Sequence, residues 1–178
     1  MIGPEVERAL AIVSREAFTP VHARSDAKSV ALVAQAAGIT PGSRVLEVGT
    51  GAGYQTAVLV ALGAQVYTIE RVAALAELAR ARLPAQSVQV RMGDGRLGWP
   101  EAAPFDVVLL GASAPTVPPA LLPQVGPGGR LVAPLGSPTR QQLVVLQRMP
   151  WGRFRRQVIA DVLFEPLAPA QDAAKTLQ

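Results

Sequence analysis

Three alternate glycines, Gly49, Gly51 and Gly53, follow directly after the apolar run at residues 45–48 in the stretch VLEVGTGAGY. The run has the length and composition of a buried strand, and the residues after Gly53 have the apolar pattern of a helix. Glycine permits positive φ angles and lets a ligand lie close to the backbone. A helix N-terminus also presents free N–H groups and a partial positive charge to an anionic group. We therefore expect a strand–turn–helix unit that binds a ligand, because a simple turn does not need three glycines.

Strand-type and helix-type segments alternate along the rest of the chain. Strands are expected at residues 44–49, 64–70, 87–93, 104–112 and 128–136, and helices at residues 54–63, 71–83 and 118–126. Residues 141–149 and 154–167 are expected to form a closing antiparallel pair around the turn PWGR. This alternation predicts an α/β fold, a doubly wound Rossmann-like seven-stranded mixed sheet. Ligands of such folds bind beyond the carboxyl ends of the strands.

The length of 178 residues suits a single domain spanning residues 1–178. N-terminal helices are expected within residues 1–38, before the first strand. One covers residues 4–18, and the other begins at Ser25 or Asp26 and ends at Gly38. Residues 168–178 are rich in Ala, Pro and Gln, and we expect them to form a flexible tail.

The composition excludes several classes of chemistry. The sequence has no cysteine, a single histidine at position 22, and a net charge of +4. Disulfides and thiolate nucleophiles are therefore excluded, and a metal site is not expected, because such sites usually draw on several imidazoles or thiolates. Neither a signal peptide nor a membrane span is recognisable, so a cytoplasmic protein is expected. The mild positive charge is weak support for a nucleic-acid partner, which we regard as unlikely.

Acidic side chains stand at the ends of successive predicted strands. Glu70 ends the stretch VYTIE, 21 positions after Gly49, where an acid can hold both hydroxyls of a ribose. Asp94 lies beside Gly95 in the stretch GDG and is placed to accept a hydrogen bond from an adenine amino group. Taken singly, the two acids are also explained as a solvated glutamate at a helix start and an ordinary turn aspartate. Their common position at one edge of the sheet favours a shared ligand.

The nature of that ligand follows from which parts the loops can accept. A dinucleotide fingerprint needs a third glycine at position 54, where this chain has Tyr54, so NAD is disfavoured. Glu47 lies inside the predicted strand, which is costly unless a cation or hydrogen bond meets it. A nucleoside that carries an amino acid fits better, with its ribose at Glu70, its base at Asp94, and its ammonium and carboxylate near Glu47 and the glycine turn. S-adenosylmethionine has these parts and no phosphate, in agreement with the absence of a Walker lysine.

Several stretches of the chain resemble protein-L-isoaspartate O-methyltransferases: VLEVGTGAGYQTAVL, VYTIER, GDGRLGWPEAAPFD, GASAPTVPPALL and PGGRLVAPLG. The resemblance runs from residue 45 to residue 167 and includes RALAIVSREAFTP near the N-terminus. It implies the class I methyltransferase fold, S-adenosyl-L-methionine as methyl donor, and methyl transfer to the α-carboxylate of isoaspartyl residues in proteins or peptides, a protein repair reaction. By the same resemblance, the donor-binding residues are Glu47, Gly49, Thr50, Gly51, Gly53, Tyr54, Glu70, Arg71, Asp94 and Gly95.

The acceptor side departs from the family pattern. Residues 19–25 form a shorter connector than the family segment, which ends in a GQTIS-like stretch and helps to form the acceptor site. Aligned without gaps, Ser25 falls on the family serine near the methyl donor, so it is the candidate catalytic residue. Ser25 is equally well explained as the N-cap of the helix that starts at Asp26. His22 is expected to be a loop residue rather than a catalytic base.

Three functions follow from a complete donor site beside an abbreviated acceptor side. The first is an isoaspartyl methyltransferase with a shortened acceptor lid. The second is a methyltransferase of the same fold that acts on a small molecule or RNA, and the third is a non-catalytic module that binds S-adenosylmethionine. An RNA acceptor would give a role to the cluster Arg153, Arg155 and Arg156. The ordinary explanation of that cluster is a solvated hairpin edge, where charge opposes aggregation.

Overall fold

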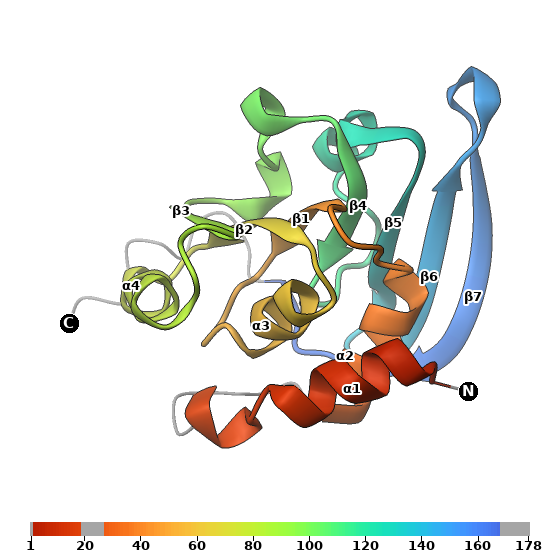
Figure 1. The fold of residues 1–178 in the computed structure, drawn as a ribbon. Coiled ribbons are helices and arrows are strands. Elements are labelled where there is room, and N and C mark those ends of the chain that lie inside the picture. The colour runs from red at the N-terminus through yellow and green to blue at the C-terminus, as the bar shows by residue number, and fades with distance from the viewer. Residues whose placement is uncertain (1, 19–26, 168–178) are drawn as a thin grey trace.

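The computed structural model describes residues 2–18 and 27–167, which contain one seven-stranded mixed sheet in the order β3-β2-β1-β4-β5-β6-β7 (Figure 1). The strands are β1 (Arg44–Val48), β2 (Gln65–Glu70), β3 (Val88–Met92), β4 (Phe105–Leu110), β5 (Val125–Ser137), β6 (Arg140–Arg148) and β7 (Phe154–Val162). β1 to β5 are parallel, and β6 and β7 close the sheet as antiparallel neighbours. The expected α/β fold is therefore confirmed, including the closing antiparallel pair.

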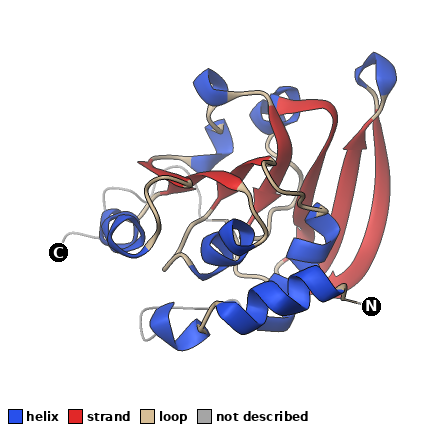
Figure 2. Cartoon of the chain, viewed as in Figure 1, coloured by secondary structure: helices blue, strands red, loops and turns tan. Residues whose placement is uncertain are grey.

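The helices are distributed unequally over the two faces of the sheet (Figure 2). One face is covered by α1 (Pro4–Ile12), α2 (Ala27–Ala37), α3 (Tyr54–Ala61) and α4 (Ala73–Arg82), with η1 (Arg15–Phe18) after α1. The described residues place only short 3₁₀ turns over the other face, namely η2 (Gly95–Leu97), η3 (Pro100–Ala102) and η4 (Pro119–Gln124), and η5 (Pro150–Gly152) at the tip of the β6–β7 hairpin. Within residues 2–18 and 27–167, no helix combines the length and apolar character needed to cross a bilayer.

Two buried clusters hold these layers together. On the helical face, Val33, Leu59 and Leu109 belong to a cluster that joins α2 and α3 to the sheet. On the other face, Leu46, Phe105 and Leu121 belong to a second cluster beneath the 3₁₀ turns. Successive residues of β1 alternate between these clusters, as expected for a central strand covered on both faces. The central strands therefore provide a rigid base for the loops at their carboxyl ends.

The single helix expected over residues 4–18 is wrong. Helix α1 ends at Ile12, Val13 is extended with φ −90° and ψ 101°, and a separate 3₁₀ turn follows. The Ser14 hydroxyl donates a hydrogen bond to Glu16 Oε2 at 2.7 Å, a local bond that competes with a continuous helix. The break also lets Phe18 turn inward, where its ring lies 6.0 Å from that of Tyr54.

Two further elements differ in type or extent from the sequence expectation. Residues 119–124 form a 3₁₀ helix containing Pro123, and β5 already begins at Val125. A proline inside the turn removes a backbone donor and prevents a regular α-helix. At the other end, β7 stops at Val162, and residues 164–167 leave the strand to bridge to Ser113. This brings the last described residues to the loop that follows β4.

Candidate functional site

The carboxyl ends of β1 and β4 meet where the strand order of the sheet changes direction, the usual ligand position in open α/β sheets. Gly111 follows β4 and donates its N–H to the Val48 carbonyl at 2.8 Å. A Cβ on Gly111 would lie 2.8 Å from the carbonyl oxygen of Gly49, too close for any other residue type. The tips of the two strands are thus packed backbone to backbone. Sequence reasoning did not single out Gly111, although a glycine directly after the apolar run FDVVLL is the available signal.

The glycine turn after β1 combines left-handed backbone conformations, which glycine adopts without strain, with open space. Gly51 and Gly53 have φ angles of +56° and +98°, and Gly53 is the left-handed N-cap residue of α3. A Cβ on Gly53 would press against Leu83, whereas a Cβ on Gly51 would meet nothing within 4 Å. Gly53 is therefore needed for packing and conformation, and Gly51 leaves room beside the backbone. A ligand can approach the chain at Gly51 without meeting a side chain.

Glu70, the last residue of β2, ties the glycine turn to the next loop. Its Oε2 accepts the Gly51 N–H at 2.8 Å, and its Oε1 accepts the Val72 N–H at 2.9 Å. The side chain is buried at 6% exposure. Each carboxylate oxygen can accept more than one hydrogen bond, so acceptor capacity remains after these two bonds. The structure thus brings Glu70 to the glycine turn, as the sequence led us to expect.

Glu47 lies beneath the turn, inside the protein. It is fully buried, and its carboxylate accepts hydrogen bonds from Thr56 Oγ1 at 2.5 Å, Thr68 Oγ1 at 2.8 Å and Gln55 Nε2 at 3.0 Å. Thr50 joins this network through a 2.6 Å contact between its hydroxyl and that of Thr68. The network fixes the start of α3 against β1 and β2. A direct role of Glu47 or Thr50 toward a bound donor stays a prediction.

Burial raises the pKa of Glu47 to about 7, although the hydrogen bonds from Thr56, Thr68 and Gln55 act in the opposite direction. Gln55 itself is an unforeseen member of the site. Its Oε1 is buried and has no hydrogen-bond partner among the described residues, while its Nε2 serves Glu47. The amide lies close to Gly111, because a Cβ there would be 3.6 Å from Gln55 Nε2. Its place directly after the glycine turn was the only sequence signal for this role.

Asp94 and Gly95 follow β3 and lie at the same edge of the sheet. Gly95 is buried, and a Cβ on it would overlap Val48 Cγ1 at the tip of β1. The Asp94 carboxylate accepts the backbone N–H of Arg96 at 3.0 Å and pairs with its guanidinium, with Nη2 at 2.8 Å from Oδ2. These hydrogen bonds from Arg96 hold the pKa of Asp94 below its usual value, and the charge of Arg71 acts in the same direction. Arg96 was not foreseen as a partner of Asp94.

Tyr54, also expected at the donor site, begins helix α3 and is largely buried. Burial raises the pKa of its hydroxyl. Its ring packs against Phe18 of η1, so it links the glycine turn to the N-terminal segment. Ser25 and His22 lie outside the described residues, and their expected roles remain predictions.

The loop after β4 is joined to the C-terminal part of the described chain. Ser113 N–H donates to the Glu165 carbonyl at 2.8 Å, and the Leu167 N–H donates to the Ser113 carbonyl at 2.6 Å. Gln141, at 2% exposure, holds Phe164 on both sides of its backbone, with Nε2 to the carbonyl at 3.0 Å and Oε1 to the N–H at 2.7 Å. Sequence reasoning missed both Ser113 and Gln141. They fix residues 164–167 beside the loop that follows β4.

The basic cluster on β7 does not form a single surface. Arg156 lines a cavity of about 500 Å³ together with Arg140, beside the loop after β4. Arg155 lines a different cavity of about 460 Å³ that contains Leu32 and Arg130. Neighbouring residues of a strand point to opposite faces of the sheet, which explains the separation. Arg155 and Arg156 therefore lie on different faces of the sheet.

A model of the family described as "Protein-L-isoaspartate(D-aspartate) O-methyltransferase (PCMT)" matches residues 3–172 of the chain. A protein-L-isoaspartate O-methyltransferase of Methylorubrum populi is 45% identical over an alignment of 185 positions, which covers 93% of this chain and 87% of that protein. One from Anaeromyxobacter dehalogenans is 42% identical, with 89% and 87% coverage. A third, from Methylorubrum extorquens, is 52% identical over 140 residues, and here the match covers 78% of this chain but only 61% of the relative.

Solved structures share the fold at lower sequence identity. A protein-L-isoaspartate O-methyltransferase superposes with a TM-score of 0.83 at 24% identity, covering 94% of this chain and 62% of that chain. A protein-L-isoaspartate O-methyltransferase from Plasmodium falciparum, solved with S-adenosyl-L-homocysteine, has a TM-score of 0.76 at 19% identity, with 94% and 92% coverage. The described sheet and helices therefore have the class I methyltransferase fold.

Proposed function

This chain belongs to the protein-L-isoaspartate O-methyltransferase family, and we propose that it methylates the free α-carboxylate of isoaspartyl residues in proteins or peptides. It is an S-adenosylmethionine-dependent methyltransferase by family and fold. The proposal concerns the acceptor and the residues that bind donor and acceptor.

One observation carries the donor site: the Glu70 carboxylate accepts the Gly51 N–H at the carboxyl ends of the strands, beside the point where the strand order reverses. This places an acid, an unobstructed glycine backbone and the start of α3 within one small region. The open space at Gly51 is the kind of cradle that a side chain would fill, and it suits a ligand that lies against the backbone. These residues fit S-adenosylmethionine.

We assign the parts of the donor to the loops as follows. The ribose hydroxyls would donate hydrogen bonds to Glu70, whose oxygens retain acceptor capacity. The adenine amino group would lie at Asp94 and Gly95. The charge of Arg71 is near enough to Asp94 to lower the pKa of its carboxyl. The amino-acid end would lie against Gly49, Gly51 and the start of α3, whose free N–H groups suit a carboxylate.

The reaction requires little acid–base catalysis by the protein. Bound S-adenosylmethionine would supply a methyl group on a sulfonium, an electrophile that an acceptor carboxylate oxygen could take with thioether sulfur as the leaving group. A carboxylate is already ionised at neutral pH, so no general base is needed. The chain's own contribution is to align the two reactants and exclude water, through the closely packed tips of β1 and β4. The buried hydrogen bonds beneath the glycine turn fix the start of α3 against β1 and β2, which supports the alignment of the reactants.

The acceptor would approach over the loop after β4, where Ser113 and residues 164–167 are joined by backbone hydrogen bonds. We propose that Ser25, which aligns with the family serine, is the residue that contacts the acceptor or the donor. Action on cytoplasmic proteins is part of the same proposal.

The decisive experiment offers a labelled methyl donor together with an isoaspartyl peptide, and with the same peptide containing ordinary aspartate. We expect labelled, base-labile ester on the isoaspartyl peptide alone. Binding of S-adenosylhomocysteine is measured in parallel by calorimetry. Binding without transfer to the isoaspartyl peptide would refute the proposed acceptor, and a flat calorimetric trace would refute the donor site as well.

A further inference from the structure

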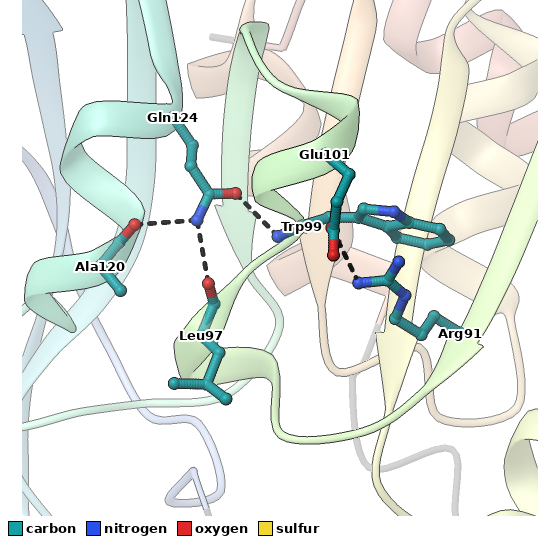
Figure 3. Close-up of polar contacts among 6 residues, drawn as sticks. All are labelled: Arg91, Leu97, Trp99, Glu101, Ala120 and Gln124. Atoms are coloured by element: carbon teal, nitrogen blue, oxygen red, sulfur yellow. Dashed lines mark hydrogen bonds and ion pairs between the residues drawn. The ribbon is translucent and has the colours of Figure 1, made fainter.

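A buried glutamine on the helix-poor face is bonded to the loop that carries Asp94 (Figure 3). Gln124 ends η4 and is 4% exposed. Its Oε1 accepts the Trp99 N–H at 2.7 Å, and its Nε2 donates to the Leu97 carbonyl at 2.9 Å and to the Ala120 carbonyl at 2.8 Å. Two of these three bonds reach across to residues 97–99. One side chain thus supplies both a donor and an acceptor to the backbone of another loop.

The backbone of that loop is shaped around the Gln124 amide. Gly98 lies between the two bonded residues and has a φ angle of +68°. A Cβ on Gly98 would overlap both the nitrogen and the oxygen of the Gln124 amide. The glycine therefore allows the backbone to approach the nitrogen and oxygen end of the amide closely. This close fit is specific to the position, since a turn on the protein surface would not need it.

The same loop is held at its other end by the donor site. Gly93 N–H donates to the Glu70 carbonyl at 3.0 Å, and Gly95 packs directly on Val48 at the tip of β1. Asp94 lies between these two contacts. Its position is therefore set by the strand tips on one side and by Gln124 on the other.

Beyond residue 98 the loop is fixed by its tryptophan. The Arg91 guanidinium lies 4.0 Å from the centre of the Trp99 ring and forms an ion pair with Glu101 at 3.2 Å. The Trp99 ring also packs edge-on against Tyr67, with the ring centres 5.5 Å apart. The Trp99 side chain is thus held by Arg91 and Tyr67, while its backbone N–H is held by Gln124.

We propose that Gln124 is a positioning residue for the methyl donor: it holds residues 94–98 so that Asp94 and Gly95 are in place for the adenine. The inference rests on the proposed donor site. Gln124 lies on the segment between β4 and β5, which leads away from the reacting edge, so it acts through the loop and does not touch the donor. Its effect is confined to the adenine end, far from the methyl group that is transferred.

The test is Gln124→Met, which keeps length and volume but removes both hydrogen-bonding groups. We expect Kd for S-adenosylhomocysteine, measured by calorimetry, to rise about tenfold, as for the loss of one net hydrogen bond of about 1.4 kcal/mol. In turnover assays KM for the donor should rise by a similar factor, while kcat at saturating donor stays within about twofold of wild type. A purely structural role would lower the amount of active protein, and so kcat, without changing KM.

The matched control is Gln141→Met. Gln141 is also buried and also bonds a backbone through both ends of its amide, but its partner Phe164 belongs to the segment that bonds to the loop after β4, not to the loop that carries Asp94. It should lower stability without changing Kd for S-adenosylhomocysteine. If both variants weaken that binding equally, or if Gln124→Met binds as wild type does, the inference is wrong.

A measurement on the unaltered protein covers the case in which Gln124→Met does not fold. Because coupling between sites is reciprocal, bound S-adenosylhomocysteine should slow hydrogen exchange at the Trp99 amide. Unchanged exchange at Trp99, with clear binding, would overturn the inference and leave the proposed function intact. Failure of the wild-type protein to bind at all would instead refute the donor site itself.

Discussion

At the scale of single residues, the donor edge depends on buried polar side chains that are satisfied within the protein. Glu47 accepts hydrogen bonds from side chains alone, and Glu70 accepts them from the backbone of two loops. Burying a carboxylate is costly unless such bonds compensate. The two acids therefore have different duties. Glu70 fixes loop positions around open space, and Glu47 stabilises the base on which the glycine turn lies.

Replacing Glu70 by alanine should weaken binding of S-adenosylhomocysteine by at least about 1–2 kcal/mol, the value of a hydrogen bond to a charged group. The change removes the proposed acceptor for the ribose and also the acceptor of the Gly51 N–H. Calorimetry on Glu7→Ala provides the control, since Glu7 is an exposed acid on α1. Equal losses in the two variants would contradict a specific role for Glu70.

Glu47 should make stability depend on pH. Its pKa is about 7 in the folded protein against a usual value of 4.5, so the folded state holds the proton more tightly. The resulting stabilisation is full below pH 4.5 and is lost as the pH rises through about 7, with a span on the order of 3 kcal/mol. Urea unfolding at pH 5 and pH 8 should show this loss in the wild type and not in Glu47→Gln. Parallel pH profiles of the two proteins would count against it.

At the scale of elements, the contact between β1 and the loop after β3 is the tightest at the donor edge. Gly95→Ala would place a methyl group into Val48, with an expected loss of about 1–3 kcal/mol in unfolding free energy and weaker donor binding. Val48→Ala removes the obstructing methyl groups, so the double variant should be less unstable than the sum of the single ones. Denaturant unfolding of all four proteins checks this. Strict additivity would show that the two positions do not press on each other.

The strands were predictable because apolar runs bounded by glycine and acidic residues are read directly from the chain. Residues 104–112, for example, were expected as a strand, and β4 occupies Phe105–Leu110. The break after Ile12 was not predictable, since the apolar spacing continues and only the local Ser14–Glu16 bond and the packing of Phe18 on Tyr54 interrupt it. The early start of β5 at Val125 depends on pairing with Phe105, a contact between distant parts of the chain.

The residues of the candidate site were likewise predictable only in part. Glu70, Gly51 and Asp94 were found from their positions at strand ends. The partners Gln55, Thr68 and Gln124 were not, because each lies on a different element from the residue it supports and single residues of these types carry no pattern. Hydrogen bonds such as Gln124 to Trp99 join residues 25 positions apart and become visible only in the folded chain.

At the scale of the whole molecule, ligand binding should stabilise the fold. A ligand at a concentration of 100 times its Kd adds about 2.7 kcal/mol to the free energy of unfolding. For a chain of this size, that corresponds to a rise in Tm of roughly 5–10 °C. We expect that shift with S-adenosylhomocysteine in a thermal melt. ATP, which shares the adenosine but carries phosphates, is the control and should have little effect. An equal shift with ATP would indicate a general nucleotide site.

The unequal covering of the two sheet faces has a consequence for product release. Short 3₁₀ turns protect few backbone amides. The layer formed by η2 and η4 should therefore open at a lower free-energy cost than the layer of α-helices on the opposite face of the sheet. Such breathing would let the spent nucleoside escape while the four α-helices and the strands stay folded. The residence time of the product should then depend on the opening of these turns rather than on global unfolding.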